Sequence, residues 1–394
     1  MDRRRFLRAA VLGASSIAMG FSVTRSSIAF PNRPGPSPYG PLLGADEHGV
    51  ELPRGFTSRV VARSAEAVAG TGYTWHGAPD GGACFADRGG WIYVSNAELS
   101  DGAGGASALH FDEGGEITDA YEILAGTSRN CAGGGTPWRT WLSCEEVEDG
   151  FVFEADPWGL RQAVRRDAMG RFTHEAAACD PVRKVVYLTE DEPDGGFYRF
   201  IPTAWPNLAS GVLQIMTERS GEPIWVDVPD PIPAPDRPTR TQLAETKRFD
   251  GGEGACYRNG YCYFTTKGDD RVWAYHAGAN TLDVIHDDGS PDGSPLSGVD
   301  NITSDVHTGD LYVAEDGGNR EICLITPEDV VAPFLRVTGQ PASELCGVAF
   351  NPAGDRMYFS SQRGPIGDSH GGVTYEISGP FRGTGRSAWF PALR

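Results

Sequence analysis

The chain has 394 residues, a formal net charge of −19, 52 glycines and 28 prolines. Its apolar runs are short, rich in Val, Tyr, Phe and Trp, and lack the 3.6-residue period of long amphipathic helices, so we expect an all-β protein. The negative charge disfavours nucleic acids and anionic membrane surfaces as partners, because like charges repel.

The first 29 residues have the pattern of an export signal. The stretch "DRRRFLR" resembles a twin-arginine signal, and the weakly apolar segment after it ends near Val23, too short for a stop-transfer helix. Ser27-Ile28-Ala29 fits a signal peptidase site, so the mature chain is expected to begin near Phe30. Loss of residues 1–29, with five Arg and one Asp, changes the net charge from −19 to −23. We therefore expect export by the twin-arginine machinery to a periplasmic or extracellular location, without a stable membrane span.

A Pro-rich lead-in, residues 30–55, precedes a phrase that recurs six times. Each copy has a ligating residue beside small residues, a short strand, a turn, an aromatic-rich strand and a second polar cluster. The first ligating residues, which we call the anchors, are Asp80, Cys131, Glu175, Glu253, Asp300 and Glu344. The steps between them are 51, 44, 78, 47 and 44 residues. Four of these steps match a four-stranded propeller blade, which predicts a six-bladed β-propeller over residues 56–394. An all-β sandwich with chance recurrence of strands is the alternative.

The long step contains eight prolines between Pro202 and Pro238. We interpret about 202–245 as a Pro-rich insertion between two blades, an extended loop that would also suit a lid.

Propeller geometry would gather distant acids at one axis, because the inner strand of every blade lines the central channel. The residues predicted to meet there are Cys131, Glu145, Glu175, Glu190, Glu253, Asp300, Glu315 and Glu344. Crowding desolvated carboxylates costs several kcal/mol per charge, so the pattern predicts metal ions. Carboxylate oxygens suit Ca²⁺, whereas one thiolate among carboxylates suggests iron. Zinc is disfavoured because neither CxxC nor HExxH occurs.

The eight cysteines leave two possibilities open. Disulfides would suit an oxidising compartment, but a protein exported in the folded state first meets a reducing cytoplasm. Cys256 and Cys262 flank a hairpin turn. If Asn259-Gly260 is a two-residue turn, Cys262 faces Tyr257, and only a three-residue loop would allow the disulfide.

Several phrases together resemble one known family. They include "PDGGACF", "WIYVSNAE", "NCAGGGTPWRTWLSCEE" and "ELCGVAFNPAGDRMYFSSQ". The sequence from about 38 to 365 is similar to the PhoX-type alkaline phosphatase family, also called the DUF839 family. This resemblance implies a six-bladed propeller exported by the twin-arginine route, with an axial iron and calcium cluster that hydrolyses phosphate monoesters.

The resemblance also implies roles for individual residues. Cys131 matches the thiolate ligand of iron, the Glu145-Glu146 pair contains a further metal ligand, and Asn96 matches the residue that contacts substrate phosphate. The best candidates for the remaining ligands are Glu175, Glu190, Glu253 and Glu344. The catalytic set implied is Asn96, Cys131, Glu145 and Glu344.

The sequence departs from the family at two places. Family phosphatases carry a phosphate-clamping arginine just before the glutamate that matches Glu344, where this chain has Ser343. Arg320 or Arg363 could reach the site instead. The "SNAE" phrase has Ala97 where many relatives have His.

The leading hypothesis is a monomeric, exported, metal-dependent phosphomonoesterase acting on a small-molecule phosphate ester. One alternative is a calcium-dependent lactonase or esterase, in which the axial thiolate would have no use. The other is a non-enzymatic, metal-stabilised binding module of the cell envelope, because a fold does not imply an activity.

Overall fold

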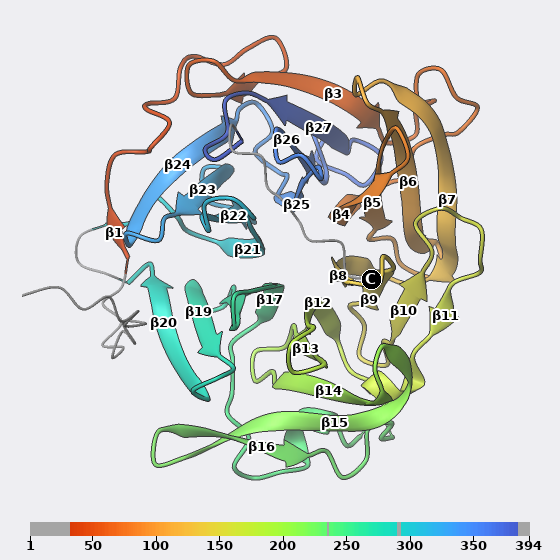
Figure 1. The fold of residues 1–394 in the computed structure, drawn as a ribbon, viewed down its shortest axis with the longest axis vertical. Coiled ribbons are helices and arrows are strands. Elements are labelled where there is room, and N and C mark those ends of the chain that lie inside the picture. Colours follow the sequence, from red (N-terminus) through yellow and green to blue (C-terminus); the bar gives the residue numbers. More distant parts are fainter. Residues whose placement is uncertain (1–31, 235, 290–292, 385–394) are drawn as a thin grey trace, which may run out of the picture.

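The computed structural model describes residues 32–234, 236–289 and 293–384. Its strands form six sheets arranged around a central axis (Figure 1). The predicted six-bladed β-propeller is therefore confirmed. The predicted export signal, residues 1–29, lies outside the described residues. Within the described ranges, none of the helices is long and apolar enough to cross a membrane.

Each blade runs from an inner strand at the axis to an outer strand at the rim. The inner strands are β4 (Pro79–Asp87), β8 (Asn130–Gly135), β12 (His174–Asp180), β17 (Gly252–Arg258), β21 (Val299–Ser304) and β25 (Leu345–Phe350). The second strands are β5 (Gly90–Ala97), β9 (Trp141–Glu145), β13 (Val185–Glu190), β18 (Tyr261–Thr266), β22 (Leu311–Glu315) and β26 (Arg356–Ser361). The third strands are β6 (Gly104–Asp112), β10 (Val152–Ala155), β14 (Phe197–Ala204), β19 (Arg271–His276), β23 (Glu321–Ile325) and β27 (Val373–Ser378). The outer strands are β7 (Ile117–Thr127), β11 (Val164–Arg165), β15 (Asn207–Arg219), β20 (Thr281–Asp287), β24 (Val330–Val337) and β3 (Thr57–Arg63).

One sheet closes the ring by combining segments from both ends of the propeller. β3 pairs antiparallel with β27, so Thr57 lies opposite Ser378. The short strands β1 (Arg33–Pro34) and β2 (Val50–Glu51), from the predicted lead-in, both pair with β24. Because β3 completes the sheet of the last repeat and precedes the first blade in the chain, it holds these two blades together.

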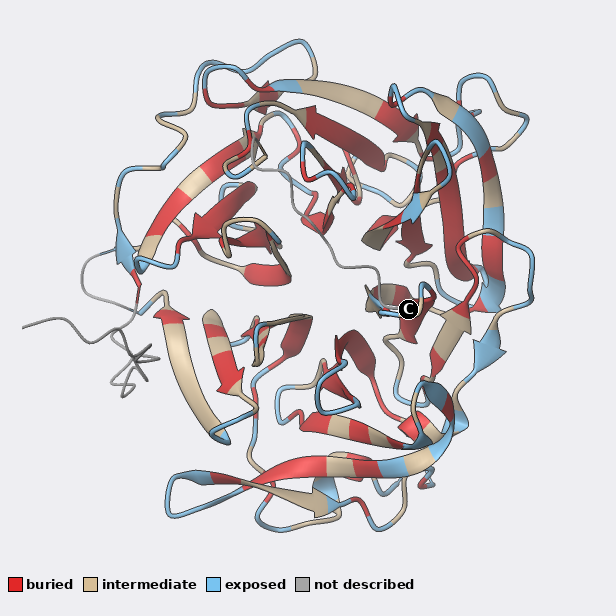
Figure 2. Cartoon of the chain, in the orientation of Figure 1, coloured by how far each residue is buried: buried red, intermediate tan, exposed pale blue. Residues whose placement is uncertain are grey.

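The core lies between the blades, where the aromatic residues of the second strands pack. Tyr93 and Tyr358, from neighbouring blades, are both completely buried, and their rings stack with centroids 5.0 Å apart. Figure 2 shows the inner and middle strands largely buried and the outer strands more exposed. Burying one large side chain contributes about 1.5–3 kcal/mol, so the recurring aromatic strand provides much of the inter-blade packing.

The interpretation of residues 202–245 as an extended loop is wrong in its first half. This stretch contains the end of β14, all of β15 and a fifth strand of the same blade, β16 (Glu222–Asp227). Pro223 lies in the edge strand β16, opposite Glu218, and edge strands tolerate proline because one of their sides makes no ladder hydrogen bonds. The short 3₁₀ helix Thr239–Thr241 lies in the connection from β16 to β17.

Candidate metal centre on the propeller axis

The six anchors occupy equivalent places in the six blades. Asp80, Cys131, Glu175, Glu253 and Asp300 are each the second residue of an inner strand, and Glu344 directly precedes β25. The repeated phrase therefore brings residues from six distant parts of the chain to the same end of the central channel.

Glycines next to the anchors allow neighbouring inner strands to come into direct backbone contact. A Cβ atom on Gly81 would lie 2.6 Å from the Cα atom of Ala132, and one on Gly254 would lie 2.7 Å from the Cα atom of Asn301. On Gly347 it would lie 2.5 Å from a backbone oxygen. The hub is narrow because these positions have no side chain, and this narrowness crowds the anchors.

The crowded side chains form four overlapping groups of possible metal ligands. The groups are Asp80/Glu98/Cys131, Cys131/Glu146/Glu175, Glu175/Glu253/Asp300 and Asp300/Asp316/Glu344. Within each group one ligand atom from every residue lies within 4.8 Å of the others. Consecutive groups share Cys131, Glu175 or Asp300, so nine side chains form one continuous arc, which we call the axial ring.

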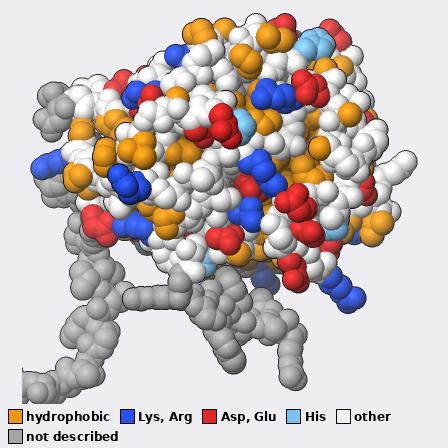
Figure 3. Space-filling model, turned by 90° about the horizontal axis from the view of Figure 1, so that it is seen from above, with side chains coloured by type: hydrophobic (Ala, Val, Ile, Leu, Met, Phe, Trp, Pro, Cys, Tyr) orange, Lys and Arg blue, Asp and Glu red, His pale blue; other side chains and the backbone are white. Residues whose placement is uncertain are grey.

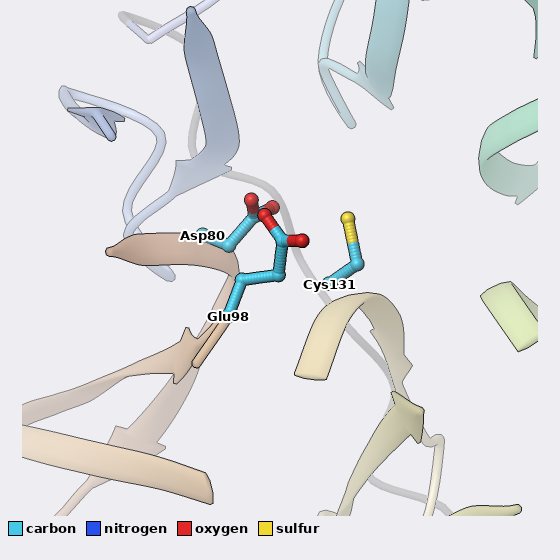
Figure 4. A group of neighbouring side chains, drawn as sticks. All are labelled: Asp80, Glu98 and Cys131. Atoms are coloured by element: carbon cyan, nitrogen blue, oxygen red, sulfur yellow. The ribbon is translucent and has the colours of Figure 1, made fainter. Parts of the chain in front are cut away.

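Figure 4 shows one end of this arc, where the carboxylates of Asp80 and Glu98 lie side by side and the sulfur of Cys131 faces the same space. Asp80 comes from β4, Glu98 directly follows β5 and Cys131 comes from β8, so two blades contribute. Gln362 adds a neutral contact: its side-chain amide donates to Asp80 and Glu98, at 2.6 Å each.

Burial and mutual repulsion disfavour the charged forms of these acids. Glu175 is completely buried, and neither of its carboxylate oxygens has a hydrogen-bond partner. Burial, followed by repulsion from Glu253, raises the pKa of Glu175 well above its usual value. Burial raises the pKa of Glu146 to about 9 and that of Asp300 to about 6. Burial and the nearby Asp80 also raise the pKa of the Cys131 thiol.

These donors fit bound cations. A buried carboxylate without partners normally costs several kcal/mol, and coordination to a cation removes that cost. The Cys131 end combines a thiol with carboxylates, the mixed donor set that suits iron. The Asp300/Asp316/Glu344 group offers only oxygen, which suits calcium.

Three cationic side chains contact the ring. Arg129 bridges two blades, with its Nη2 atom 2.8 Å from Glu98 and 2.6 Å from Glu146. Arg363 lies 3.2 Å from Glu344. Lys267 lies 2.7 Å from Glu253. All three side chains are 38–42 % exposed, so they also reach solvent at this end of the channel.

Three glutamates expected at the axis lie outside these groups: Glu145, Glu190 and Glu315. Each is the last residue of a second strand and pairs with the residue that precedes an anchor. Glu145, for example, pairs with Asn130, which precedes Cys131. Successive side chains of a strand point to opposite faces, so a shift of one residue moves a carboxylate away from the ring.

These three carboxylates instead hold the chain between the second and third strands. Each accepts the backbone N–H of the residue six positions later, which is Phe151, Gly196 or Glu321. Glu315 also lies near Glu321 and Cys323, but both of its oxygens accept backbone N–H groups and Glu321 is paired with Arg336.

Asn96 lies next to the ring but faces protein atoms. It is completely buried, its side-chain amide donates to the backbone oxygens of Cys131 and Ala132, and its oxygen accepts from Trp141 and Ser143. Its hydrogen-bonding groups therefore fix the backbone that carries the Cys131 thiol.

Sequence reasoning missed Glu98, Asp316 and the cations Arg129 and Lys267. Aligning the six phrases on their second strands would have identified most of them. The residues that directly follow those strands are Glu98, Glu146, Asp191, Lys267, Asp316 and Gln362. Arg129 lies in a loop and has a positive φ of 48°. Because it belongs to no repeated pattern, the sequence does not indicate its position.

The rest of the channel differs in character from the ring. A cavity of about 410 Å³ is lined by the residues that follow the anchors along the inner strands, mainly small ones such as Gly82, Ala132, Gly254 and Asn301. The axial ring thus lies at one end of a channel whose remaining wall is largely neutral.

Two further features lie outside the axial ring, His174 in β12 and the hairpin between β17 and β18. His174 stacks on Phe172, its Nε2 atom lies 3.1 Å from the backbone oxygen of Gly170, and burial lowers its pKa to about 3. It is therefore a neutral packing residue.

At the hairpin, Cys262 lies opposite Tyr257, as a two-residue turn predicts, and both Cys256 and Cys262 are free thiols.

One sequence family matches the middle part of the chain. The family "Alkaline phosphatase PhoX" matches residues 92–151 and 147–272, which include Cys131, Glu146, Glu175 and Glu253. This match confirms the resemblance to the PhoX-type alkaline phosphatase family. None of the curated proteins matches the chain.

Solved structures support the propeller fold of this chain. A gluconolactonase, XC5397 from Xanthomonas campestris, is similar at a TM-score of 0.52 and 14 % identity, covering 87 % of this chain and 99 % of that one. A protein of unknown function from Bacteroides thetaiotaomicron is similar at a TM-score of 0.51 and 8 % identity, covering 82 % of this chain and 76 % of that one. At such low identity the likeness concerns the propeller fold alone.

Proposed function

We propose that the protein is an exported, metal-dependent phosphomonoesterase that uses iron and calcium held by the axial ring. The observation that carries this proposal is the buried Glu175 carboxylate, without a hydrogen-bond partner, between a thiol and further carboxylates. The PhoX match supports the reaction class. Export by the twin-arginine route to the periplasm or medium belongs to the same proposal and is supported by the signal pattern in residues 1–29.

The donor sets divide the ring between two kinds of metal. Cys131, Glu146 and Glu175 would hold iron, with Asp80 and Glu98 beside it. The oxygen donors Asp300, Asp316 and Glu344 would hold calcium. When bound, such ions neutralise phosphate charge and activate water at neutral pH.

The cations that contact the axial ring would bind and orient the substrate. Arg363 is close to Glu344 and partly exposed, so its guanidinium can donate to phosphate oxygens without leaving the ring. Arg320 is a poorer candidate, because its contact is with the backbone oxygen of Pro341. Arg129, between Glu98 and Glu146, offers a second guanidinium. Asn96 acts as a positioning residue for Cys131.

Residues beside the axial ring would keep the site preorganised. The close backbone contacts at Gly81, Gly254 and Gly347 fix the inner strands, and Gln362 holds Asp80 beside Glu98. Rigid donors lose little conformational freedom when a ligand binds, which favours both metal retention and phosphate positioning.

The test is hydrolysis of p-nitrophenyl phosphate by the purified protein, supplied with iron and calcium. We expect turnover in the wild type, at least about a 100-fold loss in Cys131→Ser, and retention in the control Cys84→Ser, whose side chain packs against a hydrophobic core cluster and belongs to none of the ligand groups. Fully metallated protein without turnover rejects the proposal. Lactone hydrolysis that persists in Cys131→Ser would instead support the calcium-dependent lactonase.

A further inference from the structure

Lys267 differs in charge from its counterparts in the other blades. The residues directly after the other five second strands are Glu98, Glu146, Asp191, Asp316 and Gln362, which offer carboxylate or amide oxygens. In the blade of β17 to β20 this place belongs to Lys267, a cation. The repeat therefore replaces a ligand by a positive charge at one of six equivalent positions.

The ammonium group of Lys267 lies within the ring. Its Nζ atom is 2.7 Å from Glu253 and 3.5 Å from Asp316, so it spans two blades. Glu253 is 2 % exposed and belongs to the Glu175/Glu253/Asp300 group. A lysine is ordinarily a cation at neutral pH, and both of these contacts are ion pairs with carboxylates.

A charged ammonium and a divalent ion would compete for the same carboxylate. A second cation bound by Glu175, Glu253 and Asp300 would lie a few ångströms from Nζ, and charges at such distances repel strongly in a partly buried site. Lys267 would have to leave Glu253 for that ion to bind with full strength. The neighbouring groups at Cys131 and at Asp316/Glu344 do not contain Glu253.

We propose that the Lys267 ammonium is a built-in cation that takes the place of a divalent ion in the Glu175/Glu253/Asp300 group. The ring then binds one divalent ion fewer than its donor set would allow, and bound metals are confined to the Cys131 side and the Asp300/Asp316/Glu344 group. This inference rests on the metal-binding part of the proposed function.

The experiment compares metal content and calcium affinity in wild type, Lys267→Gln and Lys267→Met by elemental analysis and calorimetry. We expect both variants to bind one additional calcium ion per chain, or to bind calcium at least about tenfold more tightly. Lys267→Arg keeps the charge and should match the wild type. Lys247→Gln, which removes an exposed ion pair with Glu218 outside the ring, should also match it.

Each outcome is informative. Unchanged calcium stoichiometry and affinity in folded Lys267→Gln and Lys267→Met overturn the inference, while normal metal content in the wild type would leave the proposed function intact. Variants that fold only with added calcium support the inference, because calcium then replaces the missing charge. Variants that no divalent ion restores to a folded state contradict it. A wild type without metal, beside variants that bind calcium, supports the role of Lys267 and argues against the proposed function.

Discussion

Glu175 and Glu190 belong to adjacent strands of one blade, and both are completely buried. The two carboxylates have opposite surroundings. Glu190 accepts hydrogen bonds from Gly196, Tyr198 and Arg240, and its pKa rises only to about 6 because these partners offset burial. Glu175 has no hydrogen-bond partner, and its pKa rises well above its usual range. The comparison teaches that burial alone does not distinguish a ligand among these two carboxylates, whereas the lack of a hydrogen-bond partner sets Glu175 apart.

The strongest way to break this comparison is Glu175→Gln. We expect the variant to lose its iron altogether and to lose phosphatase activity with it, because the amide is a poor ligand. The metal-free protein should be as stable as the wild type or slightly more stable, since a desolvated carboxyl is removed. Metal analysis and urea denaturation provide the measurements. Full iron content in Glu175→Gln would contradict the assignment.

The opposite pattern is expected for Glu190→Gln. Removing this charge leaves Arg240, whose side chain is 13 % exposed, without its buried partner, so the free energy of unfolding should fall by about 3–5 kcal/mol. Metal content per folded chain should not change. The control is Glu192→Gln, a more exposed partner of the same arginine, with an expected loss of about 0–1 kcal/mol. Equal losses in the two variants would refute the distinction.

Substitution of the arginines near Glu344 should have a smaller effect, measured on phosphatase activity. Arg363→Gln should lower kcat/KM for p-nitrophenyl phosphate by about tenfold, the effect of one charge-assisted hydrogen bond. Arg320→Gln should leave it unchanged, because this side chain contacts a backbone oxygen outside the ring. Steady-state kinetics on metal-saturated protein would show which of the two arginines contacts the substrate phosphate. A larger loss in Arg320→Gln would reverse the assignment.

The pH dependence of stability offers a further test of the buried ring carboxylates. The pKa of Glu146 rises from 4.5 to about 9 on folding, so the metal-free folded state binds more protons than the unfolded chain between these values. Its stability should therefore fall as the pH rises from about 5 to 9. Iron and calcium should flatten this slope, because cations favour the ionised forms. Melting temperatures measured with and without metal would reveal the difference, and identical slopes would count against metal binding.

The sequence predicted the fold and the position of the anchors at the axis, because both follow from a repeat. Asp80, Cys131 and Glu253 recur at one place in each phrase, and inner strands of a propeller must meet at the axis. The β-propeller itself is visible in the spacing of the phrases. The prolines between 202 and 238 led to the wrong prediction of an extended loop, because the edge strand β16 tolerates proline.

The finer selection of ligands could not be predicted as securely. Glu145 and Glu146 are neighbours, and only the register of the strand pair decides which of them faces the axis. Arg129 reaches the ring from a loop, so its position depends on backbone angles rather than on periodicity. On the side of the molecule shown in Figure 3, acidic and basic side chains are interspersed with apolar ones.

The most direct test is a crystal structure of the purified protein, with anomalous diffraction measured on both sides of the iron absorption edge. The account predicts an iron peak within bonding distance of the Cys131 sulfur and a Glu175 oxygen. It also predicts calcium at about 2.3–2.6 Å from Asp300, Asp316 and Glu344. Density showing these side chains protonated and hydrogen-bonded to one another, in protein supplied with both metals, would contradict it.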